Sequence, residues 1–216
     1  RLPRQLAGPD RRPRDARTRR DARDRGNSTY FPDRVVPMLP DRLSNDLCSL
    51  HENVDRAVIT VKMVLDSGGR KLSHRFVRAM IRSVAACTYE EVQRAHNGTP
   101  DDRLAPLATP IIEPLYLAYT ALTKARDLRQ PLDLDLPERR IELGPDGRVI
   151  SVAFKERLDA HRLIEEFMIL ANVAAAEELI RLRRPLLYRV HEEPSPEKIE
   201  ALREVAEASG FSLAKG

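Results

Sequence analysis

Residues 30–50, YFPDRVVPMLPDRLSNDLCSL, constrain the chain most, because this stretch is apolar enough to be inside yet contains three prolines. Proline fixes φ and lacks a backbone N–H donor, so neither a long helix nor a central strand can run through it. The stretch therefore predicts a stiff, extended loop that packs against a larger element. Such a loop either connects two elements, as most rigid loops do, or fixes one side chain at its edge, which here is Tyr30.

Hydrophobic periodicity predicts two hairpins and several helices. The first hairpin consists of a buried strand over residues 57–65, a turn at 66–69 and a strand over 71–80. The end of the second strand could bend into a helix. Thr88 and Glu91 form a capping box that starts a short helix. We also expect helices over 110–128, with Pro114 in its first turn, and over 196–208, and a second hairpin over 141–152.

The longest predicted helix covers residues 157–182 and is apolar around most of its circumference, so we expect it to be largely buried. Its polar side chains are therefore informative. His161 and Glu165 share one face, and Arg162 and Glu166 form an i, i+4 pair on the neighbouring face. An unpaired buried carboxylate is costly, so Glu165 should have Arg162, another charge or a ligand as partner. His161 and Glu165 could both bind a metal, but two ligands do not make a site.

Length and composition suit one domain, or part of a larger one, with an aliphatic core: 216 residues, 42% hydrophobic and without Trp. Cys48 and Cys87 are too few for a disulfide framework, so we expect reduced thiols and a cytoplasmic protein. No run of 18 apolar residues occurs, and the N-terminus has no apolar signal segment, so we expect neither a membrane partner nor secretion.

The net charge of +4 is unevenly distributed, since residues 1–26 hold ten Arg and four Asp and the remainder is slightly acidic. An Arg-rich tail can bind nucleic acid through its phosphates. It can equally be a solvated, disordered end, because a polar run with three prolines cannot bury a core. We expect residues 1–20 to be a basic, disordered tail.

Four stretches in register resemble the ribonuclease II / ribonuclease R family, the RNB catalytic domain of 3′→5′ exoribonucleases, and the ribonuclease R branch in particular. They are residues 30–50, LDLDLPE (132–138), RLDAHRLIEEFMILANVAAAE (157–177) and LYRVHEEPSPEKIEALREVAEASGFSL (187–213). The resemblance runs from about residue 21. It implies an α+β fold with mixed, mostly antiparallel sheets and packed helices, and a domain truncated at both ends, of which residues 21–216 are the central part.

The resemblance also implies roles for particular residues. Tyr30 would stack on a base near the RNA 3′ end, Tyr89 would contact the sugar and select RNA over DNA, and Glu165 would hold the terminal ribose and help place the scissile phosphate. His161, one turn before Glu165, joins this RNA-binding set. Leu134 stands where the family has an aromatic clamp; it can cover a base but cannot stack. From chemistry alone, Tyr30 and Tyr89 could simply be packed tyrosines with satisfied hydroxyls.

Mg²⁺ is implied by the resemblance, but the family's Asp cluster and its catalytic Arg have no counterpart in this chain. The aspartates at 101, 102, 133 and 135 lack the family's spacing and are interpreted as solvated carboxylates. The resemblance implies a parent enzyme that degrades single-stranded RNA processively to nucleoside 5′-monophosphates, with no DNA partner, whereas this chain alone should have little activity. A non-catalytic RNA-binding module and an inert fragment remain alternatives.

Overall fold

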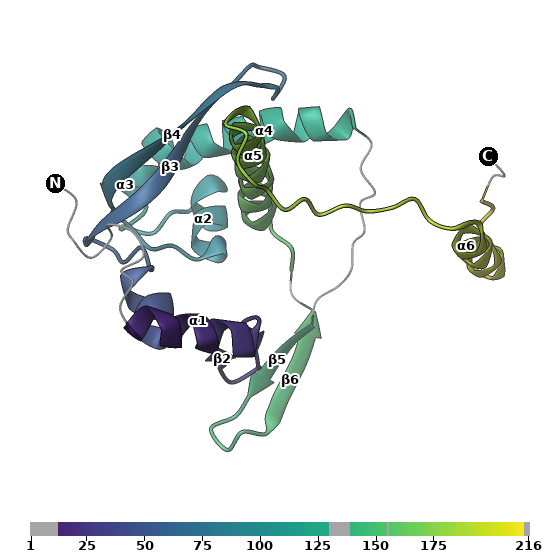
Figure 1. Cartoon of the computed structure of the whole chain (residues 1–216), viewed down its shortest axis with the longest axis horizontal. Helices are drawn as coiled ribbons and strands as arrows, with labels where there is room; N and C mark the ends of the chain where they lie inside the picture. Colours follow the sequence, from purple (N-terminus) through teal and green to yellow (C-terminus); the bar gives the residue numbers. More distant parts are fainter. Residues whose placement is uncertain (1–12, 130–138, 155, 214–216) are drawn as a thin grey trace. The chain divides into compact units, whose positions relative to one another are not determined.

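The computed structural model describes residues 13–129, 139–154 and 156–213 (Figure 1). Over these ranges the chain is α+β, with helices and two-stranded antiparallel sheets, as the sequence predicts. An isolated parallel bridge between Glu52 and Ser83 accompanies the antiparallel pairs. The chain divides into two compact units, Arg1–Ala175 and Ala176–Gly216, with the boundary inside a helix.

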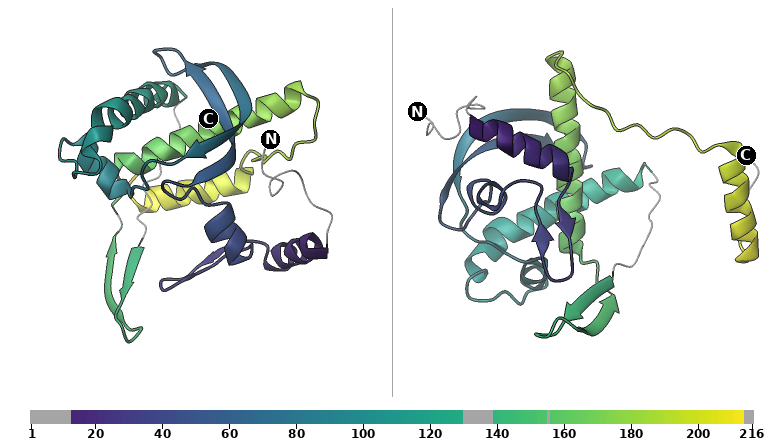
Figure 2. Two further views of the ribbon diagram at one scale, coloured as in Figure 1. Left: turned by 90° about the vertical axis from the view of Figure 1, so that its left-hand side faces the viewer. Right: turned by 60° about the horizontal axis from the view of Figure 1, so that its bottom comes forward.

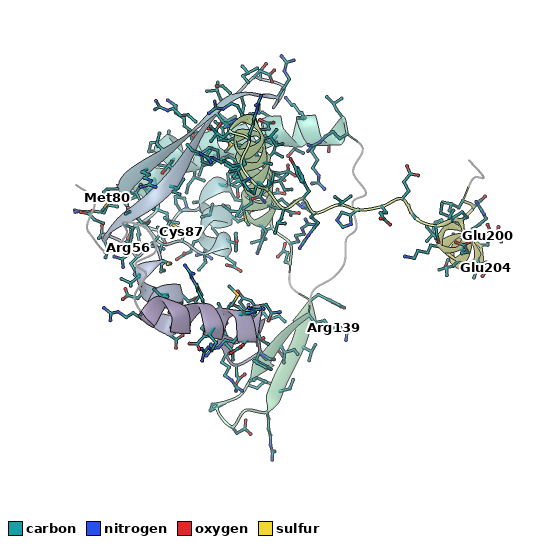
Figure 3. The ribbon with its side chains drawn as sticks, viewed as in Figure 1. Arg56, Met80, Cys87, Arg139, Glu200 and Glu204 are labelled. Atoms are coloured by element: carbon teal, nitrogen blue, oxygen red, sulfur yellow. The ribbon has the colours of Figure 1, made fainter. Side chains whose placement is uncertain are left out.

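The proline-containing stretch forms short elements only, as predicted. Strands β1 (Thr29–Tyr30) and β2 (Val35–Val36) pair as a small hairpin, and η2 (Arg42–Leu47) is one π-helical segment. Most of its apolar side chains are exposed, so the expectation that the stretch packs against a larger element is wrong within this chain. Arg56, labelled in Figure 3, donates from Nε to the Ser49 carbonyl (2.9 Å) and ties the end of the stretch to the next strand.

Strands β3 (Asp55–Leu65) and β4 (Lys71–Arg82) form the first predicted hairpin. Asp66 closes its turn by accepting the backbone N–H groups of Gly68 (3.0 Å) and Arg70 (2.9 Å). Gly69, at φ +81°, lies against helix α4, where an added Cβ would be 2.0 Å from the Ala121 carbonyl oxygen. Two expectations are wrong: β4 stays extended to Arg82 instead of bending into a helix, and no residue of β3 is fully buried.

Helices α2 (Tyr89–His96), α3 (Ala105–Leu107), α4 (Glu113–Asp127) and α5 (Asp159–Arg181) supply the core, and the π-helical η3 (Ala108–Ile112) leads into α4. The capping box is confirmed, since Thr88 Oγ1 accepts the Glu91 N–H (3.2 Å) and Glu91 Oε2 accepts the Thr88 N–H (2.6 Å). The buried cluster is Ala95, Leu104, Ile112, Tyr116 and Leu163.

Helix α5 is less buried than predicted. Only Ala160, Leu163, Glu166 and Ala174 of this helix are buried, whereas Met168 and other apolar side chains around it are exposed. The described packing covers one stripe of the helix, which accounts for the difference. Helix α5 is therefore apolar around most of its circumference without being buried on all sides within this chain.

The second predicted hairpin is confirmed as β5 (Arg139–Leu143) and β6 (Val149–Phe154), joined by a tight turn (Figure 2). In the second unit, the predicted last helix is confirmed as α6 (Pro196–Ala208). Ser195 is its N-cap, with Oγ accepting the Lys198 N–H, and Gly210 follows its end at φ +81°.

Helix α1 (Pro13–Arg25) corrects the expectation of a disordered tail over residues 1–20, because residues 13–20 are helical. Residues 1–12 lie outside the described ranges. Within α1 the Arg25 guanidinium donates to the Pro37 carbonyl (2.6 Å), so the helix end contacts the proline-containing stretch.

Candidate functional site

Two predicted RNA-contacting side chains meet where helices α2 and α5 begin. Tyr89 is the first residue of α2, directly after the Thr88 cap, and His161 lies in the first turn of α5. Their rings are stacked, with centroids 4.1 Å apart and planes inclined by 22°. Tyr89 remains 41% exposed, so the stack leaves part of the tyrosine accessible to a ligand.

His161 presents one hydrogen-bond donor that has no partner. Its Nδ1 accepts the backbone N–H of Leu158 (3.2 Å), so the proton of the neutral ring is on Nε2. Nε2 is buried and has no hydrogen-bond partner. A buried donor left unpaired costs free energy, so this Nε2–H is an exception among the buried polar atoms of the described residues, next to the stacked Tyr89 ring.

Glu165, one turn after His161, has the charged partner that was expected, although it is Arg157 rather than Arg162. Arg157 Nη2 donates to Glu165 Oε2 at 2.7 Å, while Arg162 Nη1 donates to Asp159 Oδ1 at 3.1 Å. The Glu165 side chain is 51% exposed, so the assumption that it is a buried carboxylate is wrong. Its exposure leaves it able to exchange Arg157 for a ligand hydroxyl.

Glu166 is instead the buried carboxylate of α5, and it pairs with Arg126 of α4 at 3.5 Å between Nε and Oε1 rather than with Arg162. Glu166 lies three residues after the buried Leu163 and so shares its face of the helix. Because apolar residues surround the helix, the sequence did not show which stripe faces inward.

Gln93 of α2 was not singled out from the sequence, yet it joins three helices. Its Oε1 accepts the Ala160 N–H of α5 (3.0 Å) and the Tyr116 hydroxyl of α4 (3.3 Å), and its Nε2 donates to Asn97 Oδ1 (3.2 Å). Burial raises the pKa of Tyr116 to about 12, and the charges of Asp159 and Tyr119 act in the same direction. Nothing in the sequence indicates this set, because its members lie far apart along the chain.

Tyr30 lies on β1 and is 78% exposed. Among the described residues, no hydrogen bond, ion pair or ring contact joins it to Tyr89, His161 or Glu165. Leu134 falls outside the described ranges. The structure thus brings Tyr89, His161 and Glu165 to the start of α2 and α5, and the place of Tyr30 and Leu134 in the same site stays a prediction.

Metal-binding groups are absent from the described ranges: no three His, Cys, Asp or Glu side chains there are grouped to hold an ion. Asp101 Oδ1 instead accepts the Leu104 N–H (2.8 Å) within a turn. Cys48 and Cys87 are both free thiols. In the part of the chain that is described, no helix is long and apolar enough to cross a bilayer.

The RNB domain family matches residues 11–215, and the chain therefore belongs to that family of α+β domains. The match begins before residue 21, where the resemblance was expected to start. Ribonuclease R of Escherichia coli strain K12 is 39% identical over 199 residues, which are 91% of this chain and 24% of that protein. The chain thus spans about a quarter of the length of this curated relative.

Three solved structures are also similar in fold to this chain. Mycoplasma genitalium RNase R in complex with ribose-methylated single-stranded RNA is similar with a TM-score of 0.84 and 27% identity, over 91% of this chain and 31% of that one. The same protein in complex with double-stranded RNA gives a TM-score of 0.87 and 26% identity over 95% and 37% of the two chains. Yeast Ssd1, described as a pseudonuclease, shares the fold at 19% identity and a TM-score of 0.65, over 92% and 24%.

Proposed function

We propose that this chain binds the 3′ end of single-stranded RNA as part of a processive 3′→5′ exoribonuclease. The observation that carries the proposal is the Tyr89–His161 stack, in which His161 lies one helical turn before an exposed carboxylate, Glu165. Membership of the RNB family and similarity to ribonuclease R support the same function.

The proposed contacts follow from the hydrogen-bonding capacity of each group. Glu165 accepts from ribose hydroxyls. His161 belongs to the same RNA-binding set through its ring, which stacks on Tyr89. The Tyr89 hydroxyl can form a hydrogen bond with a ribose 2′-OH, which is the group that distinguishes RNA from DNA. Tyr30 offers an exposed ring for stacking on a base, which contributes about 1–3 kcal/mol per base without sequence preference. Leu134 would cover a base without stacking.

Hydrolysis requires Mg²⁺, which would polarise the scissile phosphate and supply a nucleophilic water. The described residues do not fit such a site, since they contain no group of three suitable ligands. We therefore assign no metal ligand among the described residues and derive no hydrolytic step from them. In the whole enzyme, the products would be nucleoside 5′-monophosphates and the location cytoplasmic.

A non-catalytic RNA-binding module is the second candidate. It is favoured by the same shortage of metal ligands in the described ranges and by the likeness in fold to a pseudonuclease. Both candidates require RNA binding, and they differ only in whether the full-length protein hydrolyses the bound strand. An inert fragment would do neither.

The binding test compares a labelled single-stranded RNA with the DNA of the same sequence by fluorescence anisotropy. We expect tighter binding of RNA, and about tenfold weaker RNA binding by Tyr89→Ala and Glu165→Ala, since each loses about one ligand hydrogen bond. Tyr188→Ala, an exposed tyrosine in the second unit, is the matched control and should bind as the parent does. Equal affinity for RNA and DNA, or unchanged binding by both site variants, would overturn the site assignment.

A separate assay distinguishes the two candidates. Full-length protein incubated with Mg²⁺ and 5′-labelled RNA should shorten the strand from its 3′ end and release mononucleotides if it is an exoribonuclease. Tyr30→Ala and Glu165→Ala should slow that trimming. Retention of intact RNA in a bound complex would favour the non-catalytic module.

A further inference from the structure

Gln93 occupies a position between the helices that carry the candidate site. It follows Tyr89 by one turn on α2, and its Oε1 accepts the backbone N–H of Ala160, the residue next to His161 on α5. Helices α2 and α5 are therefore joined twice at neighbouring points, by the Tyr89–His161 rings and by the Gln93–Ala160 hydrogen bond.

These two contacts restrict different motions. Ring stacking holds the two rings face to face, and offset arrangements of the rings are also favourable, so it does not by itself fix one relative position. The hydrogen bond is directional, and it uses a backbone N–H in the first turn of α5, where no acceptor within the helix is available. Ala160 is only 2% exposed, so water does not readily replace Gln93 as the acceptor. The hydrogen bond therefore sets the rotation and height of α5 against α2.

The Gln93 amide is itself held in place from a third helix. The Tyr116 hydroxyl of α4 donates to the same Oε1, and the Tyr116 ring is 5% exposed and stacked on His96 with centroids 3.5 Å apart. On the other side of the amide, Nε2 donates to Asn97. Because the Tyr116 hydroxyl already engages Oε1, this oxygen end of the amide is directed at Ala160 without requiring the Asn97 contact.

We propose that Gln93 is a positioning residue for RNA recognition: its side-chain carbonyl holds the first turn of α5 in register with α2, so that Tyr89, His161 and Glu165 contact the same nucleotide. This inference rests on the proposed RNA binding and deepens it. Gln93 itself need not touch RNA, since its polar atoms are engaged by Ala160, Tyr116 and Asn97.

Two substitutions of Gln93 test whether its hydrogen-bond acceptor, rather than the length of its side chain, positions α5. Gln93→Met keeps the length but removes the acceptor, whereas Gln93→Glu keeps an oxygen that can accept from Ala160 and Tyr116. Asn97→Ala is the matched control, because it removes the partner of Nε2 and leaves the acceptor intact.

The first readout is binding of single-stranded RNA and of DNA of the same sequence by this chain. Gln93→Met should weaken RNA binding about tenfold, the loss expected for a displaced hydrogen-bonding group, and should reduce the preference for RNA. Gln93→Glu and Asn97→Ala should stay within about twofold of the parent. Parental RNA affinity in Gln93→Met, or an equal loss in Gln93→Glu and Gln93→Met, would overturn the inference.

The second readout needs no RNA. The Tyr89 ring current shifts the ring-proton NMR resonances of His161, and this shift should shrink in Gln93→Met and return in Gln93→Glu. An unchanged shift in Gln93→Met would show that the hydrogen bond does not set the register. If the parent chain binds no RNA, the proposed function fails, whereas the NMR comparison still decides whether Gln93 positions α5.

Discussion

The helical core and the β1–β2 hairpin are stabilised in different ways. Side chains from α2, α4 and α5, far apart in sequence, enclose one buried cluster and fix Tyr89 against His161. The hairpin is held by its own backbone pairs and by nearby contacts such as Arg25 with Pro37, and Tyr30 is exposed. Ordering a side chain upon binding costs free energy. We therefore expect Tyr89 to be preorganised for RNA and Tyr30 to become ordered when RNA binds.

The largest expected effect is on the core. Leu104 is 1% exposed, so Leu104→Ala should lower the free energy of unfolding by about 2–5 kcal/mol, because it leaves a cavity. Ile150→Ala on the exposed β6 strand should change it by about 0.5 kcal/mol or less. Chemical denaturation followed by circular dichroism measures both. Similar losses in the two variants would remove the energetic distinction between the core and the hairpins.

Adjacent carboxylates on α5 allow a sharper comparison. Arg126→Met leaves the buried Glu166 without this cation and should cost about 1–3 kcal/mol. Arg157→Met beside the exposed Glu165 should cost less than about 1 kcal/mol, since water solvates that carboxylate. The same denaturation experiment applies. Glu166→Gln in the Arg126→Met background should recover part of the loss, and the absence of any recovery would contradict a desolvated charge as the cause.

The start of α2 should contribute a smaller amount. Thr88→Ala removes one half of the capping box and should lower the free energy of unfolding by about 1 kcal/mol. Thr88→Ser keeps the hydroxyl and should remain close to the parent. Because Tyr89 follows the cap directly, the Ala variant should also broaden the NMR resonances of the Tyr89 ring. A variant with parental stability would show that the cap is dispensable here.

The last expected effect appears only at alkaline pH and is absent at neutral pH. Burial raises the folded-state pKa of Tyr116 to about 12, above the value of 10.0 that is usual for tyrosine. The stability that the protonated Tyr116 side chain contributes is therefore fully present below pH 10 and is lost as the pH rises towards 12. The reason is that Tyr116 releases its proton at a lower pH in the unfolded chain than in the folded one. Tyrosinate absorbance at high pH should contain a phase near pH 12 that Tyr116→Phe removes and Tyr188→Phe retains. Loss of that phase in both variants would contradict the assignment.

Local features were predictable from the sequence, whereas contacts between distant segments were not. The Asp66–Gly69 turn and the Thr88–Glu91 cap depend on residues within four positions of each other, and both formed as expected. The inward stripe of α5 could not be chosen, because Leu163 and Ile164 are equally apolar. Burial of β3 was overestimated for a related reason: β-branched residues indicate a strand but not what covers it.

Within the candidate site, the sequence indicated which residues to expect, but not the burial and the partners of their side chains. Tyr89 and Glu165 came from a family resemblance, and His161 from its place one turn before Glu165 on the same helix face. The structure adds the ring stack, the Leu158 N–H donated to His161 Nδ1 and the Arg157 partner of Glu165. Gln93 was not predicted, because a single glutamine on a short helix forms no recurring pattern in the sequence. Its role depends on Ala160 and Tyr116, which only the folded chain brings together.

The turn between β3 and β4 carries a consequence for tolerated sequence variation. At Gly69 a positive φ and the nearby Ala121 carbonyl act together, so a larger residue would be excluded both by backbone conformation and by collision with α4. Relaxing the turn alone would not relieve the collision. Saturation mutagenesis of this codon should return glycine almost exclusively among folded clones, while the neighbouring codon for Ser67 should accept many amino acids.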